Sequence, residues 1–329
     1  MTVTPHDAFQ VIAVLDPSVT TENVGDEIIF DAVRTEIQRL FGDPLLIRIS
    51  THAFMTGDAR RLLKKASHVF VGGSNLLRSR MEWNIQWKLS PIDLLVRRNA
   101  ILLGCGWRND EGAPTPYTRM LYKRVLSPTA LHSLRDSSAT AQLQKAGFGN
   151  SLNTACITMW GLTQEHCAAI PTGKAEDVVI TLTAYHPDLE NDRAIVEAAF
   201  RHYRNVSLFV QQPEDFVYAR SLTDKPFHRV VASLSAYDAL LEGSIDYIGT
   251  RLHGGMRAIQ KKKRALIAVI DNRARDIGAD TGIPVVPRPG LHPHVERWIT
   301  TTAPTRITLP DAAIAAWRGQ FGKAVRTST

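Results

Sequence analysis

Residues 245–259 read Ile-Asp-Tyr-Ile-Gly-Thr-Arg-Leu-His-Gly-Gly-Met-Arg-Ala-Ile, and this stretch decides the fold class. The short apolar run from Tyr247 to Thr250 predicts a buried strand. Met256 and Ile259, with the alanine between them, predict one apolar side of a following helix. A parallel strand that leads into a helix places the turn at the carboxyl edge of a sheet, where α/β proteins bind ligands.

The turn between this strand and this helix holds an arginine, a histidine and two glycines. Gly254 and Gly255 let a ligand approach the backbone closely, and the first free N–H groups of the helix attract anions. We therefore expect Arg251 and His253 to lie beside an anion-binding site. The alternative is an ordinary surface pair on a loop, because a lone Arg-x-His motif is weakly specific.

The same strand–loop–helix design occurs near the start of the chain. Val11–Leu15 predicts a buried strand, and apolar residues at helical spacing predict a helix over residues 28–40. Asn23, Gly25 and Asp26 then lie at the expected rim of the sheet. Gly25 allows a ligand to approach beside Asp26. Alternatively, Asn23 or Asp26 simply caps the helix.

A third repeat of the design follows the strand that is predicted at residues 68–71. Gly72 and Gly73 indicate backbone N–H groups that face a ligand, and Ser74 and Asn75 follow directly. The spacing is not the GxGxxG of dinucleotide-binding proteins, and the lysine of a P-loop is missing. We therefore reject both of these nucleotide-binding motifs at this position.

Two further strand ends carry candidate side chains. The strand predicted at 100–103 ends in Gly-Cys-Gly, and its Cys105 is a candidate nucleophile. Packing is the favoured interpretation of Cys105, because no base is specified nearby. The strand predicted at 131–134 ends at Arg135 and Asp136. Arg135 can face a ligand, and Asp136 can cap the next helix or hold Arg135.

The length and the order of elements predict two domains. A chain of 329 residues is too long for one ordinary core. Strands and helices alternate in both halves, with a polar segment at 168–177 between them, which predicts two parallel sheets. We expect an α/β protein with two Rossmann-like domains, 1–170 and 171–329, that face a central cleft. A terminal helix predicted at 311–325 is expected to pack back across the first domain.

The composition limits the partners and the compartment. The net charge of +7 indicates an anionic partner, such as a phosphorylated substrate, a membrane surface or nucleic acid. Nucleic acid is disfavoured, because no basic patch is interleaved with aromatic residues. We recognise no secretory signal and no membrane-spanning window, and three dispersed cysteines fit a reducing cytoplasm. No ligand spacing predicts a metal site.

Four motifs, taken in order, resemble those of the polysaccharide pyruvyl transferases: Asn23-x-Gly25-Asp26, residues 70–76, Arg135-Asp136 and residues 249–254. The resemblance runs from about residue 20 to about residue 286. It implies a GT-B-like architecture and the transfer of a pyruvyl group from phosphoenolpyruvate to a sugar, which gives a pyruvate ketal. It also implies that Arg251, Leu252 and His253 take part in donor binding and catalysis.

The chain departs from the family pattern in three places. Ser74 stands where the family often has a third glycine. After the late strand, where the family has tyrosine followed by lysine, this chain has Ile270-Asp271-Asn272-Arg273. The helix after His253 carries a run of four cations over residues 261–264. These departures bear on the acceptor and the donor more than on the fold.

The reaction implied by the resemblance gives each candidate residue a role. Proton transfer to the methylene carbon suits a histidine, so His253 is the expected acid or base. Arg251 and Arg135 are expected to grip the carboxylate and phosphate of the donor. Asp26 is expected to act on the acceptor hydroxyl or to orient a catalytic group. The expected substrate-binding residues are Asn23, Gly25, Gly72, Gly73, Ser74, Asn75, Arg135, Leu252, Gly254, Asn272 and Arg273.

We expect phosphoenolpyruvate as co-substrate, no cofactor and no metal ion. The expected acceptor is a sugar or a lipid-linked glycan. The expected location is the cytoplasm, with peripheral contact at the anionic inner face of the membrane. A GT-B glycosyltransferase that uses a nucleotide sugar is the alternative within the same fold. A non-catalytic sugar- or phosphate-binding protein is the alternative from another functional class.

Overall fold

The computed structural model describes residues 10–83, 86–90, 93, 99–108 and 112–322. These residues form two compact units. The first unit runs to Thr21, resumes over Ile29–Ile157 and includes the chain from Pro310. The second unit holds Glu22–Ile28 and Thr158–Leu309. The division predicted from the sequence, 1–170 and 171–329, treats each half as one continuous segment, whereas the chain crosses between the units several times.

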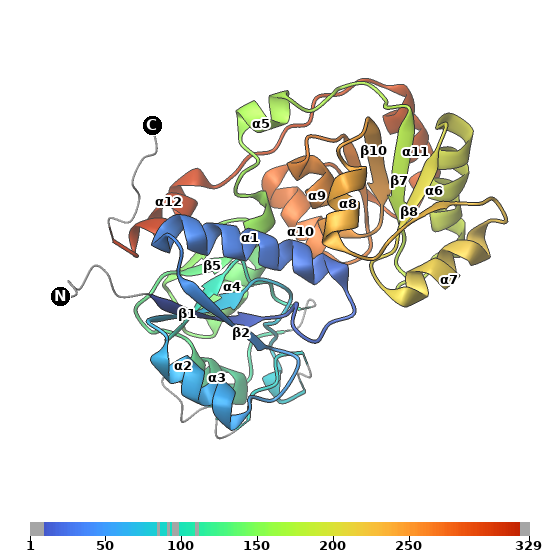
Figure 1. The fold of residues 1–329 in the computed structure, drawn as a ribbon. Coiled ribbons are helices and arrows are strands. Elements are labelled where there is room, and N and C mark those ends of the chain that lie inside the picture. The colour runs from blue at the N-terminus through green and yellow to red at the C-terminus, as the bar shows by residue number, and fades with distance from the viewer. Residues whose placement is uncertain (1–9, 84–85, 91–92, 94–98, 109–111, 323–329) are drawn as a thin grey trace, which may run out of the picture. The chain divides into compact units, whose positions relative to one another are not determined.

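The first unit is built on a four-stranded parallel sheet, in the order β2 (Leu45–Ser50), β1 (Val11–Asp16), β3 (His68–Gly72) and β4 (Ala100–Leu103). Ile12, Ala13 and Val14 of β1 are fully buried, as expected for an inner parallel strand that is covered on both faces. In Figure 1, α1 (Val24–Phe41) lies over one face of this sheet. α2 (Gly57–Lys65) and α3 (Pro116–Val125) lie over the other.

Smaller elements complete the first unit. They are η1 (Met81–Trp83), β5 (His132–Leu134), α4 (Ser137–Lys145), β6 (Ser151–Asn153) and α12 (Asp311–Gly319). β5 and β6 pair in parallel, and a bridge from Cys105 to Leu134 places β5 after the end of β4. Arg318 of α12 donates two 2.7 Å hydrogen bonds to Glu36 of α1, which fastens the terminal helix to this unit. Residues 323–325 of the predicted terminal helix lie outside the described residues.

The second unit is built on a six-stranded parallel sheet, in the order β12 (Val285–Pro287), β11 (Ala265–Val269), β10 (Ile245–Gly249), β7 (Asp177–Thr181), β8 (Val206–Phe209) and β9 (His228–Val230). One face packs against α6 (Leu189–His202), α7 (Pro213–Leu222) and α11 (Leu291–Thr300) (Figure 1). The other side carries α8 (Leu234–Leu240), α9 (Leu252–Gln260) and α10 (Asn272–Thr281). The short elements η3 (Ile157–Met159) and α5 (Gln164–Ala168) precede β7.

The prediction of an α/β fold with two parallel sheets is confirmed. The stretch that decided the fold class forms β10 and α9 as expected. β6, α5 and α11 were not expected from the sequence. α11 nevertheless shows a helical pattern, because Leu291, Val295 and Ile299 are buried at intervals of four residues.

β10 depends on a glycine at its last position. Gly249 pairs in register with Thr181 of β7. A Cβ atom at Gly249 would lie 2.5 Å from the backbone oxygen and 2.8 Å from the backbone nitrogen of Thr181. Both are backbone atoms of the neighbouring strand, so a side chain at this position would push the two strands apart.

We predict that Gly249→Ala destabilises the second unit by about 1–3 kcal/mol, the usual cost of overpacking a core. For a unit of this size the melting temperature should fall by roughly 2–12 °C. Gly243→Ala is the control, because a Cβ there would make one ordinary 3.5 Å contact, with the oxygen of Leu240. Differential scanning calorimetry of both variants measures the effect. Equal melting temperatures would contradict the packing role of Gly249.

His132 is a buried histidine whose two ring nitrogens are both hydrogen-bonded. Nδ1 accepts from the backbone N–H of Leu102 at 3.2 Å, and Nε2 donates to the oxygen of Ser127 at 2.9 Å. Burial lowers the pKa of His132 to about 4. The neutral ring therefore helps to hold β4, and protonation would remove the acceptor for Leu102.

We predict that this histidine makes stability depend on pH. Between pH 6.5 and about 4 the unfolded chain binds a proton at His132 and the folded chain does not. The free energy of unfolding should therefore fall as the pH falls through this window, by at most about 1.4 kcal/mol per pH unit from this group. Urea titrations at pH 7 and pH 5 test it against His132→Gln, which cannot take up the proton. An identical loss of stability in the variant would rule out His132 as the source.

Candidate active site

The first turn of α9 presents backbone N–H groups without a side-chain cap. Arg251 is the N-cap residue, with extended backbone angles, and its side chain makes no capping hydrogen bond. His253 follows in the first turn and is 8% exposed. Leu252 is also buried. The helix thus begins without a side-chain cap, and the positive end of its dipole lies beside Arg251 and His253.

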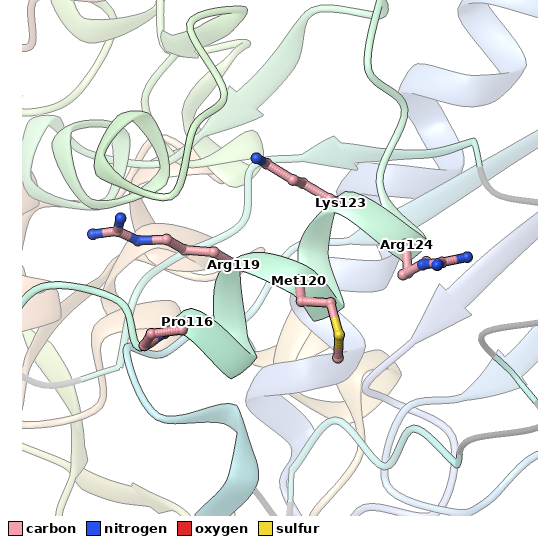
Figure 2. Close-up of a pocket in the computed structure, with 5 residues that line it drawn as sticks. All are labelled: Pro116, Arg119, Met120, Lys123 and Arg124. Carbon is pink, nitrogen blue, oxygen red and sulfur yellow. The ribbon is translucent and has the colours of Figure 1, made fainter.

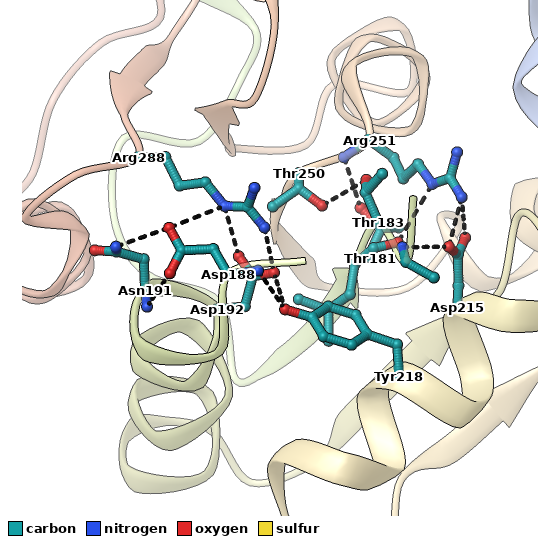
Figure 3. Close-up of polar contacts among 12 residues, drawn as sticks. Thr181, Thr183, Asp188, Asn191, Asp192, Asp215, Tyr218, Thr250, Arg251 and Arg288 are labelled. Carbon is teal, nitrogen blue, oxygen red and sulfur yellow. Dashed lines mark hydrogen bonds and ion pairs between the residues drawn. The ribbon is translucent and has the colours of Figure 1, made fainter. Parts of the chain in front are cut away.

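Arg251 is buried and held by partners from two neighbouring strand ends (Figure 3). Its Nη2 donates to Asp215 at 2.5 Å and to Oε1 of Gln212 at 2.7 Å, and its Nε donates to the oxygen of Leu182 at 3.3 Å. The guanidinium carbon lies 4.9 Å from the ring centre of Tyr185. Within the described residues, Nη1 is left with no hydrogen-bond partner. One nitrogen of Arg251 is thus available to an anion.

Asp215 binds more than the arginine. Its carboxylate also accepts from the backbone N–H of Ala184 at 3.0 Å and from that of Gln212 at 3.1 Å. These two residues lie on the loops after β7 and β8, while Arg251 lies after β10. A single buried carboxylate therefore ties three strand ends together.

Gln211 lies between two glycines that the sequence singled out. A Cβ atom at Gly25 would lie 3.0 Å from its Oε1, and one at Gly254 would lie 2.7 Å from its Nε2. The backbone oxygen of Gln211 accepts from the N–H of Val24 at 3.1 Å. Its side-chain Nε2 is buried without a hydrogen-bond partner. Both glycines thus make room for the Gln211 side chain, and an unpaired amide donor lies beside the first turn of α9.

The first turn of α1 belongs to the same unit as α9. Oδ1 of Asn23 accepts from the N–H of Gly25 at 3.0 Å, and the backbone oxygen of Asn23 accepts from Asp26 at 3.0 Å. Asn23 therefore caps the helix, which was one of the two interpretations of this motif. Asp26 lies in the first turn and is 9% exposed.

A second cluster lies at the carboxyl edge of the sheet in the first unit. Arg135 is buried and donates to Asp136 at 3.0 Å and to Asn75 at 3.1 Å. Asp136 also accepts from the N–H of Ala139 at 2.6 Å, so it both caps α4 and holds Arg135. Gly106 is required here, because the guanidinium of Arg135 fills the space that a side chain would need.

The Gly72–Asn75 turn supports this cluster through its backbone. Gly73 and Ser74 both have positive φ angles, 72° and 60°. A Cβ atom at Gly73 would overlap Ile29 of α1, and one at Gly72 would touch Val14. The oxygen of Ser74 accepts from the N–H of Gly106 at 2.8 Å. These glycines are required at least in part by close packing.

Cys105 is buried and packs against the backbone of this turn. Its thiol donates to the backbone oxygen of Val71 at 3.3 Å. Burial raises the pKa of Cys105 to about 12, which keeps the thiol protonated. A buried, protonated thiol is a poor nucleophile, so we interpret Cys105 as a packing residue.

Arg273 also lies at the carboxyl edge of the second sheet. It pairs with Asp271, which caps α10, and donates to the hydroxyl of Tyr185 at 2.8 Å. Tyr185 therefore contacts both Arg251 and Arg273. Asn272 is the first residue of α10 and is partly buried.

Another buried ion pair lies at this edge, apart from the predicted residues (Figure 3). Arg288, which follows β12, donates to Asp192 of α6 at 3.0 Å. The hydroxyl of Tyr218 donates to the same carboxylate at 2.7 Å. Burial raises the pKa of Asp192, and Arg288 and Tyr218 oppose this shift. The pair connects α6 with the chain after β12.

The predicted site residues thus fall into two groups. Residues 23–26, 251–254 and 272–273 belong to the second unit, and residues 72–75 with Arg135 belong to the first. That both groups border one cleft stays a prediction. The sequence analysis did not identify four further residues of this edge, although each lies just after the end of β7 or β8: Tyr185, Gln211, Gln212 and Asp215. Among the described residues, no cluster of histidine, cysteine and carboxylate side chains has the arrangement of a metal site.

Comparisons with known proteins place this geometry in context. A family model described as polysaccharide pyruvyl transferase matches residues 23–272. A comparison with curated proteins finds no match. A UDP-GlcNAc 2-epimerase of Methanocaldococcus jannaschii, solved with UDP-GlcNAc and UDP, is 12% identical, with a TM-score of 0.50 over 92% of this chain and 95% of that chain. The S. aureus protein MnaA, solved with UDP, is 10% identical, with a TM-score of 0.50 over 89% and 88%.

At these identities the two solved structures show the fold alone, which is GT-B-like. The family model is more specific, because its match covers most of the chain. The match includes the Asn23–Asp26 turn, the Gly72–Asn75 turn, Arg135 and the first turn of α9. The chain therefore belongs to the polysaccharide pyruvyl transferase family.

Proposed function

We propose that this transferase moves a pyruvyl group from phosphoenolpyruvate to two hydroxyls of one sugar, with the donor's anionic groups bound at the first turn of α9. The observation that carries the proposal is the unpaired, buried Nε2 of Gln211 beside that turn. A buried amide donor without a partner is costly, and an anion oxygen would satisfy it. Uncapped helix N–H groups and Nη1 of Arg251 lie on the same turn and favour the same ligand.

The chemistry then follows from the donor. An acid protonates the methylene carbon of phosphoenolpyruvate, which becomes a methyl group. The first sugar hydroxyl attacks the adjacent carbon and loses its proton to a base. The bond from that carbon to the phosphate oxygen breaks, the second hydroxyl attacks, and its proton leaves with the phosphate. The products are a cyclic pyruvate ketal and inorganic phosphate.

We assign the proton transfers at the donor to His253, because histidine exchanges protons near neutral pH. Arg251 stabilises the donor's negative charge through Nη1, while Asp215 fixes the rest of its guanidinium. Asp26 acts on the acceptor hydroxyl, and Arg135, held by Asn75 and Asp136, contributes positive charge from the first unit. The proposed acceptor is a sugar or a lipid-linked glycan. The proposed compartment is the cytoplasm, which the three free cysteines fit.

The rival proposal is a glycosyltransferase that uses a nucleotide sugar. Both solved structures of similar fold hold UDP, and a helix N-terminus also suits a diphosphate. Thermal-shift titration separates the two, since a ligand that binds only the folded chain raises its melting temperature. Phosphoenolpyruvate should stabilise the protein and UDP or GDP should not. The reverse pattern would replace our proposal with the rival.

The histidine is tested by its effect on turnover. We predict that His253→Ala lowers the single-turnover rate by ~10²–10⁴-fold, because it removes a positioned acid or base. The dissociation constant for phosphoenolpyruvate should change by less than about threefold, because the groups that bind the donor in the ground state are retained. Phosphate release with a panel of methyl glycosides measures the rate, and calorimetry measures affinity. His292→Ala, an exposed histidine on α11, is the control. A wild-type rate in folded His253→Ala would remove the acid–base role.

The arginine is tested as a pair, because removing Arg251 alone leaves Asp215 buried and charged. We predict that Arg251→Gln with Asp215→Asn weakens phosphoenolpyruvate binding by roughly 10–100-fold, the effect of one lost charge-assisted hydrogen bond. Arg288→Gln with Asp192→Asn is the matched control, since it neutralises the other buried pair at the same edge. Calorimetric titration compares the two double variants. Equal donor affinities in both would show that Arg251 does not bind the donor.

A further inference from the structure

The outer face of α3 is cationic and also exposes large apolar groups. Tyr117 and Met120 are each 46% exposed. Figure 2 shows three cationic side chains of this helix extending away from it around Met120. Together with the helix start they border an open depression of about 520 Å³, lined by Pro116, Arg119, Met120, Lys123 and Arg124.

Three cations of this face lack an acidic partner among the described residues, unlike the buried arginines of the two sheet edges. Arg119, Lys123 and Arg124 form no ion pair within the part of the chain that the structure describes. Arg119 donates to the backbone oxygen of Pro114 at 3.1 Å, which is a neutral acceptor. Among the described residues no carboxylate pairs with the three positive charges that this face carries over about two helical turns.

The orientation of α3 is fixed by its other side. Thr118, Leu121 and Tyr122 are almost fully buried, and Leu121 and Tyr122 belong to the core of the first unit. The hydroxyl of Tyr122 donates to the oxygen of Arg78 and accepts from its N–H, both at 3.0 Å. The helix cannot turn its cations inward without breaking these contacts, so the cationic face is a permanent surface feature.

We propose that this face of α3, formed by Tyr117, Arg119, Met120, Lys123 and Arg124, docks on anionic lipid headgroups. Cations bind the phosphates, and each basic residue near an anionic surface strengthens binding by about fivefold. Tyrosine and methionine beside them suit the boundary between headgroups and acyl chains. No helix in the described ranges is long and apolar enough to cross a membrane. The proposal does not depend on the donor or the acceptor of the reaction.

Vesicle co-sedimentation at low and at physiological salt tests the proposal. The protein should bind vesicles of phosphatidylcholine with phosphatidylglycerol and not vesicles of phosphatidylcholine alone. The triple variant Arg119→Gln, Lys123→Gln and Arg124→Gln should bind roughly 100-fold more weakly. The control removes the same charge from exposed sites of the second unit, by Lys225→Gln, Lys262→Gln and Arg306→Gln, and should lose less than about threefold. Tyr117→Ser with Met120→Ser should also weaken binding while leaving the charge unchanged.

Three results would overturn the proposal. One is vesicle binding by the α3 triple variant that equals that of the wild type. Another is an equal loss in both triple variants, which would make net charge responsible rather than this face. The third is tighter binding of duplex DNA than of anionic vesicles with the same dependence on the three cations, which would make nucleic acid the occupant. Because none of these measurements needs turnover, they stay separate from any failure of the proposed reaction.

Discussion

The buried ion pair between Arg251 and Asp215 organises the carboxyl edge of the second sheet. Taking both charges out of water is unfavourable, and only good geometry with further hydrogen bonds offsets that cost. Asp215 has these bonds, because it also accepts from Ala184 and Gln212. Removing one member of such a pair typically costs about 3–5 kcal/mol. The loops after β7, β8 and β10 are therefore held together by this pair. α9 begins directly after Arg251, which is its N-cap residue.

Gln211 extends the same network to the start of α1. Its backbone binds Val24, and its side chain occupies the space that Gly25 and Gly254 leave open. This explains why residues 22–28 belong to the second unit although the rest of α1 belongs to the first. It also leaves one amide donor unpaired beside the first turn of α9. A buried donor without a partner carries a desolvation cost, and this cost is the physical argument for an anion at this position.

The sequence predicts the elements well where the pattern is local. The run Val11–Leu15 and the stretch that forms β10 and α9 are recognisable from local patterns. Each strand is a short apolar run, and the helix repeats its apolar residues at helical spacing. α11 has the same kind of signal in Leu291, Val295 and Ile299, but the prolines around it obscured the pattern. β6 is too short and too polar to be recognised. The division of α1 between units leaves no mark in the sequence, because it depends on contacts with Gln211.

The candidate residues at strand ends could be chosen from the sequence, because parallel sheets bind ligands at the carboxyl ends of their strands. What surrounds them could not be predicted. The pairing of Arg251 with Asp215 joins residues on different loops, and no local pattern distinguishes Asp215 from an ordinary first-turn acid. Gly25 and Gly254 were singled out for the close approach of a ligand, and the structure places the Gln211 side chain against both. A glycine motif thus indicates that another group approaches the backbone, but it does not indicate whether that group is a ligand or a protein side chain.

The central claim is that a donor anion binds at the first turn of α9, and amide NMR of the ¹⁵N-labelled protein tests it most directly. We expect titration with phosphoenolpyruvate to give saturable shifts in the backbone amides of residues 252–255 and in the side-chain amide of Gln211. These groups lie in that turn or directly against it. Saturable binding that leaves all of these resonances unmoved would contradict the account.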